Sequence, residues 1–189
     1  MHGATLIDKD GNVIRPCILW NDTRSYQECE EFEKQNFDVR SISGNITMPG
    51  FTAPKINWIK NNEIDNFKKI FKVLLPKDYL RFVLTGEFFS EMSDASGTLW
   101  LDIQKRKWSN QLLSCSFLEE KHMPDLVEGN EQTGFLKKDL KEKFNFNNNV
   151  KVVGGAGDNA AAATGMGITN KNQSFISVSY THLTLPTMQ

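Results

Sequence analysis

The sequence has few cysteines and no pattern of metal ligands. Only three cysteines occur among its 189 residues: Cys17, Cys29 and Cys115. They form no CxxC pair and have no metal-binding spacing with any of the three histidines. The sequence therefore predicts neither a disulfide framework nor a bound metal. We expect three reduced thiols, as is usual in a cytoplasmic protein.

An excess of charge and a long apolar run are also missing. Lys and Arg total 22 against 23 Asp and Glu, which gives a formal net charge of -1. This balance argues against nucleic acid or an anionic membrane as a partner. No apolar stretch is long enough to span a bilayer, and residues 1–6 lack the basic and apolar pattern of a secretory signal. We expect a globular cytoplasmic protein.

What the sequence does contain is an irregular alternation of strand and helix patterns. Strands are predicted at residues 4–7, 13–19, 71–75, 150–153 and 173–178, and helices at 25–35, 54–61, 78–84, 109–116, 136–144 and 160–163. The first two strands read as a hairpin with a glycine-containing turn. The mixture places the chain in the α/β or α+β class.

A polar stretch and a change of composition divide the chain. Residues 145–149 are almost entirely asparagine and form the best candidate for a linker. We therefore predict one domain over residues 1–148 and the start of a second over 149–178. Residues 179–189 have no charged group and no helical period, and they resemble translated sequencing-adapter sequence. We expect this tail to be foreign to the fold.

A glycine-rich turn, Gly154-Gly155-Ala156-Gly157-Asp158-Asn159, follows the strand at 150–153. One interpretation is a dinucleotide site, because Gly155 to Ala160 fits G-x-G-x-x-A after a strand. The carboxylate of Asp158 would then lie beside a pyrophosphate, which is unfavourable. The other interpretation makes Asp158 a general base that accepts the proton of a substrate hydroxyl during phosphoryl transfer. A third is that Asp158 only caps the following helix.

Several further stretches shift the balance between these interpretations. In order, they are Met1-His2-Gly3, Ile18 to Arg24, Gly50-Phe51-Thr52-Ala53-Pro54-Lys55 to Asn62, Pro76-Lys77-Asp78-Tyr79-Leu80-Arg81, Leu84 to Glu87, Ser93-Asp94-Ala95-Ser96-Gly97-Thr98 and Gly157-Asp158-Asn159. Together they resemble the FGGY family of carbohydrate kinases, and within it the pattern of the bacterial D-xylulose kinases. The resemblance extends in order over residues 1 to about 178.

The resemblance implies a fold related to actin and hexokinase, with two domains that each have a ribonuclease-H-like core. This chain would hold most of the first domain and the start of the second. Sugar and ATP would bind between the domains. The implied activity is phosphorylation of D-xylulose at its terminal hydroxyl by ATP with Mg²⁺. Ribulose, gluconate or glycerol are the alternative substrates, and the complete protein could form a homodimer. A sugar-binding lobe without catalysis is the alternative from another class.

The resemblance also assigns roles to individual residues. Asp158 is implied as the catalytic base, and Met1, His2 and Asn159 as residues that hold the sugar. Trp20 matches a tryptophan that lines the polyol pocket of the related glycerol kinases, although it could also be a core residue. Gly50 stands where those kinases have a tyrosine, so that a longer sugar would have room.

Residues outside this set are interpreted as structural. We expect Trp58, Trp100 and Trp108 to pack, and Asp22 and Arg24 to form a local ion pair or cap. The Lys77-Asp78 and Ser93-Asp94 pairs are expected to fix loops and helix starts.

Two phosphate-binding elements of the family have no counterpart in the sequence. One, a D-x-G-T loop, precedes the Met-His-Gly stretch in the family, and the other follows the strand predicted at 173–178. From the resemblance we therefore expect a fragment of a longer kinase, with Met1 internal to it and without useful activity on its own.

Overall fold

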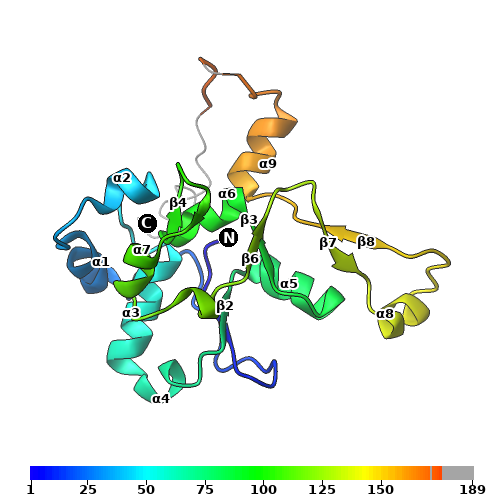
Figure 1. Cartoon of the computed structure of the whole chain (residues 1–189), viewed down its shortest axis with the longest axis horizontal. Coiled ribbons are helices and arrows are strands. Elements are labelled where there is room, and N and C mark those ends of the chain that lie inside the picture. Colours follow the sequence, from blue (N-terminus) through cyan, green and yellow to red (C-terminus); the bar gives the residue numbers. More distant parts are fainter. Residues whose placement is uncertain (171, 176–189) are drawn as a thin grey trace, which may run out of the picture.

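A computed structural model describes residues 1–170 and 172–175 of the chain (Figure 1). Helices and short strands alternate, as the α/β prediction requires. The helices in chain order are α1 (Tyr26–Glu33), α2 (Val39–Ser43), α3 (Thr52–Asn62), α4 (Ile64–Phe67), α5 (Pro76–Thr85), α6 (Met92–Ala95), α7 (Asn110–Ser114), α8 (Lys138–Lys143) and α9 (Asp158–Gly165). Short 3-10 turns lie at Ser96–Thr98 and Glu120–His122.

The strands form two-stranded sheets within the described residues. They are β1 (Thr5–Ile7), β2 (Lys72–Leu74), β3 (Phe89–Glu91), β4 (Leu101–Asp102), β5 (Lys107–Trp108), β6 (Asp125–Val127), β7 (Gln132–Phe135) and β8 (Lys151–Val153). The pairs β1–β2, β4–β5 and β7–β8 are antiparallel, whereas β3 and β6 run parallel. In the first pair Leu6 stands opposite Val73.

Most local predictions match these elements. The expected hairpin is present as the bridges Ala4–Ile18 and Ile7–Val13 around a turn at residues 8–12, where Gly11 has a φ of 80°. Helix α5 begins with Pro76 at its first turn and ends at Gly86, which adopts a left-handed conformation. Residues 173–175 are not in a strand, and the rest of the strand predicted at 173–178 lies outside the described residues, as does the tail at 179–189.

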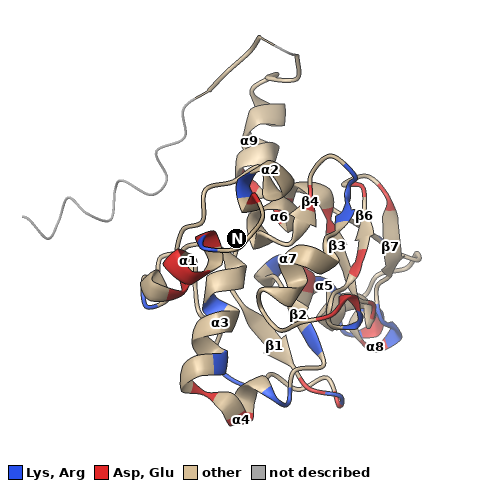
Figure 2. Cartoon of the chain, turned by 60° about the vertical axis from the view of Figure 1, so that its left-hand side comes forward, with Lys and Arg blue, Asp and Glu red and all other residues tan. Residues whose placement is uncertain are grey.

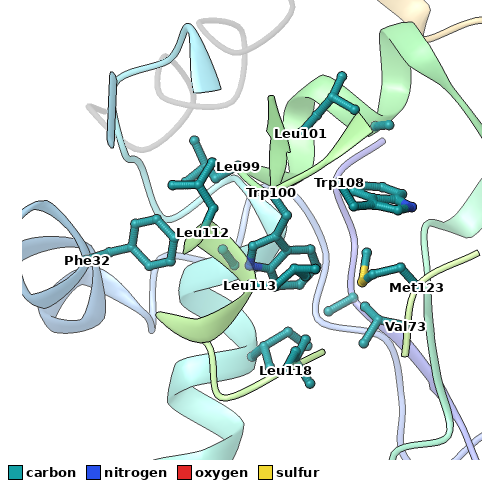
Figure 3. Close-up of a cluster of buried hydrophobic side chains, with 14 of the residues drawn as sticks. Phe32, Val73, Leu99, Trp100, Leu101, Trp108, Leu112, Leu113, Leu118 and Met123 are labelled. Atoms are coloured by element: carbon teal, nitrogen blue, oxygen red, sulfur yellow. The ribbon is translucent and has the colours of Figure 1, made fainter. Parts of the chain in front are cut away.

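One hydrophobic core joins segments that range from Ala4 to Met123 (Figure 3). Trp100 is fully buried at its centre, and its indole N–H donates to the Ser116 hydroxyl over 3.0 Å. Trp108 is also buried and donates to the Pro124 carbonyl oxygen over 2.8 Å. Each indole thus satisfies its one polar group, and the predicted packing role of these two tryptophans is confirmed.

Lys and Arg positions and Asp and Glu positions are interspersed along the ribbon in the view of Figure 2. The Asp22–Arg24 pair is a local ion pair, as expected, with Arg24 Nε 2.9 Å from one carboxylate oxygen and an Nη atom 2.7 Å from the other. Within the described part of the chain, no helix has the length and apolar character needed to cross a membrane.

Candidate functional site

A pocket of about 960 Å³ brings together segments that are far apart in the sequence. Its wall is formed by the first residues, the loop after residue 19, the segment before α3, the α6 region and the start of α9. Every predicted site residue lines it: Met1, His2, Trp20, Asp158 and Asn159, with Gly50 beside them. The sequence had placed these residues in one site only through the family resemblance, and the chain folds so that they meet.

Asp158 is the first residue of α9, and its side chain is exposed. The N-cap position belongs to Gly157, and no side chain makes a capping hydrogen bond there. The Asp158 carboxylate accepts the N–H of Asn159 over 2.7 Å. Asp158 is therefore not the N-cap residue, although its carboxylate satisfies one N–H group of the first turn. A carboxylate at this position is favoured by the helix dipole and can meet a ligand in the pocket.

The backbone of the glycine turn is held by the protein itself. The N–H of Gly154 donates to the Glu131 carbonyl oxygen over 3.0 Å, and that of Gly155 to the Gly129 carbonyl oxygen over 2.8 Å. The N–H of Gly157 donates to the Ser93 hydroxyl over 2.8 Å. A pyrophosphate cradle needs such N–H groups unoccupied. These contacts argue against the dinucleotide interpretation. They leave the Asp158 carboxylate as the group of the turn that can take part in a reaction.

The Gly154 carbonyl oxygen anchors the turn to α5. It accepts hydrogen bonds from the Lys77 ammonium over 3.2 Å and from the Arg81 guanidinium. Arg81 also pairs with Asp78, where the charged groups lie 2.9 Å apart and both side chains are buried. Burial raises the pKa of Asp78, although the neighbouring cations work against this. The expectation that Lys77 and Asp78 fix a loop is confirmed, and the loop is the one that carries Asp158.

Glu91 links the same turn to α6. Its carboxylate accepts the N–H groups of Ser93 and Asp94, each over 2.8 Å, and the Lys77 ammonium lies 3.0 Å away. Burial works to raise the pKa of Glu91, but the hydrogen bonds from Lys77 and Ser93 outweigh it and hold the pKa below the usual range. Glu91 is thus the cap of α6, a role that the sequence analysis did not assign.

His2 presents a neutral imidazole to the pocket. Its backbone is left-handed, with a φ of 53°, and its ring lies edge-on to Phe51 with the centroids 5.5 Å apart. Burial, together with the nearby positive charges of the Met1 amino group and Lys55, lowers the pKa of His2 to about 4. A neutral imidazole can accept one hydrogen bond and donate another. This suits it to hold a hydroxyl group.

Lys55, on α3, is fully buried beneath this part of the pocket. Its ammonium group donates to the carbonyl oxygens of His2 over 3.2 Å and Phe51 over 2.9 Å, and to that of Gly50. Burial lowers the pKa of Lys55 from 10.5 to about 8. One side chain thus ties the first residues of the chain to the segment before α3. The sequence alone does not indicate this role of Lys55, because bonds to carbonyl oxygens leave no pattern in the partner residues.

Replacing Lys55 by Met should therefore loosen the pocket and the fold together. The change leaves three buried carbonyl oxygens without their donor, so we expect the free energy of unfolding to fall by about 1–3 kcal/mol. Lys138→Met is the matched control, because that side chain is 89% exposed and lies 3.8 Å from Glu142. Urea unfolding should show a change within about 0.5 kcal/mol for the control. Equal stability of the two variants would contradict the role of Lys55.

Comparison with known proteins gives consistent matches. The family model described as the N-terminal domain of the FGGY family of carbohydrate kinases matches residues 1–165. A xylulose kinase of Escherichia coli (strain K12) is 51% identical over 178 residues, which cover 94% of this chain and 37% of that protein. A xylulose kinase of Klebsiella pneumoniae is 48% identical over 178 residues, with the same coverage of 94% and 37%. This chain therefore spans a little over a third of the length of these relatives.

A solved structure supports the same similarity. The crystal structure of a kinase from Brucella ovis, described as a xyloylose kinase, superposes with a TM-score of 0.87 and 55% sequence identity. The match covers 90% of this chain and 35% of the other. The predicted α/β fold of the actin and hexokinase type is confirmed by this match.

Proposed function

The chain belongs to the FGGY family of carbohydrate kinases, and on that premise we propose that it carries the sugar site and catalytic base of an ATP-dependent D-xylulose kinase. The single observation that carries the proposal is the pocket in which Asp158, Asn159 and His2 meet. The similarity to xylulose kinases, at 51% and 48% identity, supports the choice of sugar. We expect the reaction to occur in the cytoplasm, where ATP is available.

In the proposed reaction Asp158 accepts the proton of the sugar's terminal hydroxyl group. The hydroxyl oxygen attacks the γ-phosphorus of ATP, an oxygen–phosphorus bond forms, and the bond from that phosphorus to the β,γ-bridging oxygen breaks as ADP leaves. The magnesium ion enters with ATP as part of the nucleotide substrate and neutralises phosphate charge. The chain's own contribution is to position the hydroxyl and to accept its proton.

The other pocket residues are proposed to hold and select the sugar. The Asn159 amide can donate to and accept from hydroxyl groups, and the neutral His2 ring can do the same. Trp20 offers an apolar face, and Met1 lines the same pocket. Gly50 keeps the pocket wide, and any side chain there would start 3.1 Å from the Trp20 carbonyl oxygen.

A graft tests the proposal while keeping a complete kinase. The 178 aligned residues of the Escherichia coli xylulose kinase are replaced by those of this chain, and ADP release is measured with D-xylulose, ribulose, gluconate and glycerol. We expect turnover with D-xylulose within about tenfold of the parent enzyme. Faster turnover with another sugar would overturn the choice of substrate. Sugar binding without ADP release would instead favour the non-catalytic lobe.

A further inference from the structure

Asp94, on α6, carries a carboxylate for which the fold provides no direct partner. Its side chain is fully buried, and neither carboxylate oxygen accepts a hydrogen bond from any described residue. The nearest cation is the Lys77 ammonium, 3.9 Å away, which is bonded to Glu91 at 3.0 Å. An uncompensated buried carboxylate costs stability. A group retained at such a cost calls for an explanation beyond folding.

The start of α6 does not supply that explanation. Glu91 accepts the N–H groups of Ser93 and Asp94 and therefore caps the helix. The sequence analysis expected Ser93 and Asp94 to fix a helix start together. For Ser93 this is confirmed, because its hydroxyl contacts Glu91 over 2.8 Å and accepts the N–H of Gly157. For the Asp94 carboxylate it is wrong, since that group makes none of these bonds.

A second unsatisfied atom faces this carboxylate. The Nδ1 atom of His2 is buried without a hydrogen-bond partner among the described residues, and it lies 4.0 Å from an Asp94 carboxylate oxygen. The ring reaches this position only because residue 97 is glycine, since a Cβ there would overlap Nδ1 and its neighbouring ring carbon. Bonds at functional sites are often long without ligand and shorten when it binds. A shift of about 1 Å would bring His2 Nδ1 and the Asp94 carboxylate oxygen within hydrogen-bond distance.

We infer that Asp94 is a positioning residue that holds His2 by its Nδ1 atom and thereby assigns the other ring nitrogen, Nε2, to the sugar. This inference deepens the proposed function and rests on it for the identity of the ligand. With Asp94 ionised, Nδ1 carries the proton and donates it to the carboxylate, so Nε2 is left as an acceptor for a sugar hydroxyl. Gly97 leaves room for the His2 ring, and Asp94 fixes the orientation of that ring.

The charges around the pair set the pH at which this arrangement holds. The groups that face Asp94 are Asp78, Lys77, Glu91 and the Met1 amino group, and those that face His2 are the Met1 amino group, Lys55 and Asp158. Burial, assisted by the charge of Asp78, raises the pKa of Asp94 to about 7. The pKa of His2, at about 4, lies lower. Above about pH 7 the ring is therefore neutral and faces an ionised carboxylate.

The tautomer of His2 provides a test that does not depend on activity. Long-range proton–nitrogen NMR spectra of the complete ¹⁵N-labelled chain at about pH 8 distinguish a proton on Nδ1 from one on Nε2. We expect Nδ1–H for His2. An Nε2–H tautomer of His2 in the unmodified chain would overturn the inference, whatever any variant does.

Asp94→Leu then separates positioning from a merely structural role. Leucine has the same branching at Cγ as aspartate and removes a buried carboxylate that accepts no hydrogen bond among the described residues, so the stability of the chain should be retained or increased. The His2 tautomer should change to Nε2–H, and the dissociation constant for D-xylulose should rise about five- to tenfold. Asp102→Asn is the control, because its carboxylate accepts the N–H groups of its own turn at Gln104 and Lys105. This control should change neither the His2 tautomer nor the dissociation constant for D-xylulose.

The outcomes distinguish the two proposals. If the unmodified chain shows the expected tautomer but the graft does not bind D-xylulose, the sugar assignment fails and the link between Asp94 and His2 stands. If Asp94→Leu lowers stability strongly and leaves the tautomer unchanged, Asp94 is structural and the inference fails. Gly97→Ala should weaken sugar binding at least as much as Asp94→Leu, since it displaces the ring itself. Unchanged sugar binding in Gly97→Ala would also count against the inference.

Discussion

Asp158→Asn, introduced into the graft described above, should lower turnover with D-xylulose by about 10²–10⁴-fold. Asparagine has nearly the shape of aspartate but cannot accept the proton of the attacking hydroxyl group. The dissociation constant for the sugar should change little, because Asn159, His2 and the rest of the wall remain. Steady-state ADP release and sugar titration measure the two effects separately.

Asp139→Asn is the control for this change, because Asp139 is exposed on α8 and does not line the pocket. Turnover in the control should equal that of the unmodified graft. Turnover above about a tenth of that value in Asp158→Asn would rule out Asp158 as the general base. Loss of sugar binding together with turnover would give Asp158 a binding role instead.

Gly154→Ala should lower both stability and turnover. A Cβ at this position would collide with the Glu128 carbonyl oxygen and would stand 3.1 Å from Gly129 Cα. Because both neighbours are backbone, the turn must move, and we expect the free energy of unfolding to fall by about 1–3 kcal/mol. The same movement displaces Asp158, and an error of about 1 Å in a reacting group costs on the order of 10²-fold in rate.

Gly165→Ala is the matched control for the glycine turn. Gly165 lies at the end of α9, and a Cβ there would meet no atom within 4 Å. Alanine in a helix is favoured over glycine by about 0.5–1 kcal/mol, so this variant should be slightly more stable and equally active. If urea unfolding placed the two alanine variants at the same stability, the close packing of Gly154 would not constrain the turn.

Local signals in the sequence predicted much of this fold. Pro76 and Gly86 marked the two ends of α5, and Gly11 marked the turn of the first hairpin. Strand β3 and its parallel partner β6 were missed, because each is only three residues long and its pairing joins residues about 36 positions apart, Phe89 with Asp125. Such pairing depends on contacts along the whole chain. The predicted boundary between residues 148 and 149 stays a prediction.

The candidate site was likewise predicted only in part. The family resemblance named Asp158, Asn159 and His2, and these residues do line one pocket. The supporting residues were not foreseen. Lys55 acts on backbone carbonyl oxygens, and Asp94 acts across 4.0 Å on a residue 92 positions away in the sequence. The Lys55–His2 and Asp94–His2 contacts follow no helical or strand period, so no local pattern could have indicated them.

The close packing of the turns at residues 128–131 and 154–157 also limits which substitutions this part of the chain can accept. Gly154 is confined by the Glu128 carbonyl oxygen, and Gly129 is confined in the same way by that of Gly155. Neither backbone can retreat, since the Gly155 N–H is bonded to the Gly129 carbonyl oxygen over 2.8 Å. A side chain gained at one position cannot be offset by loss at the other, because both already lack one. We therefore expect that a substitution at either glycine is tolerated only if both turns are rebuilt together.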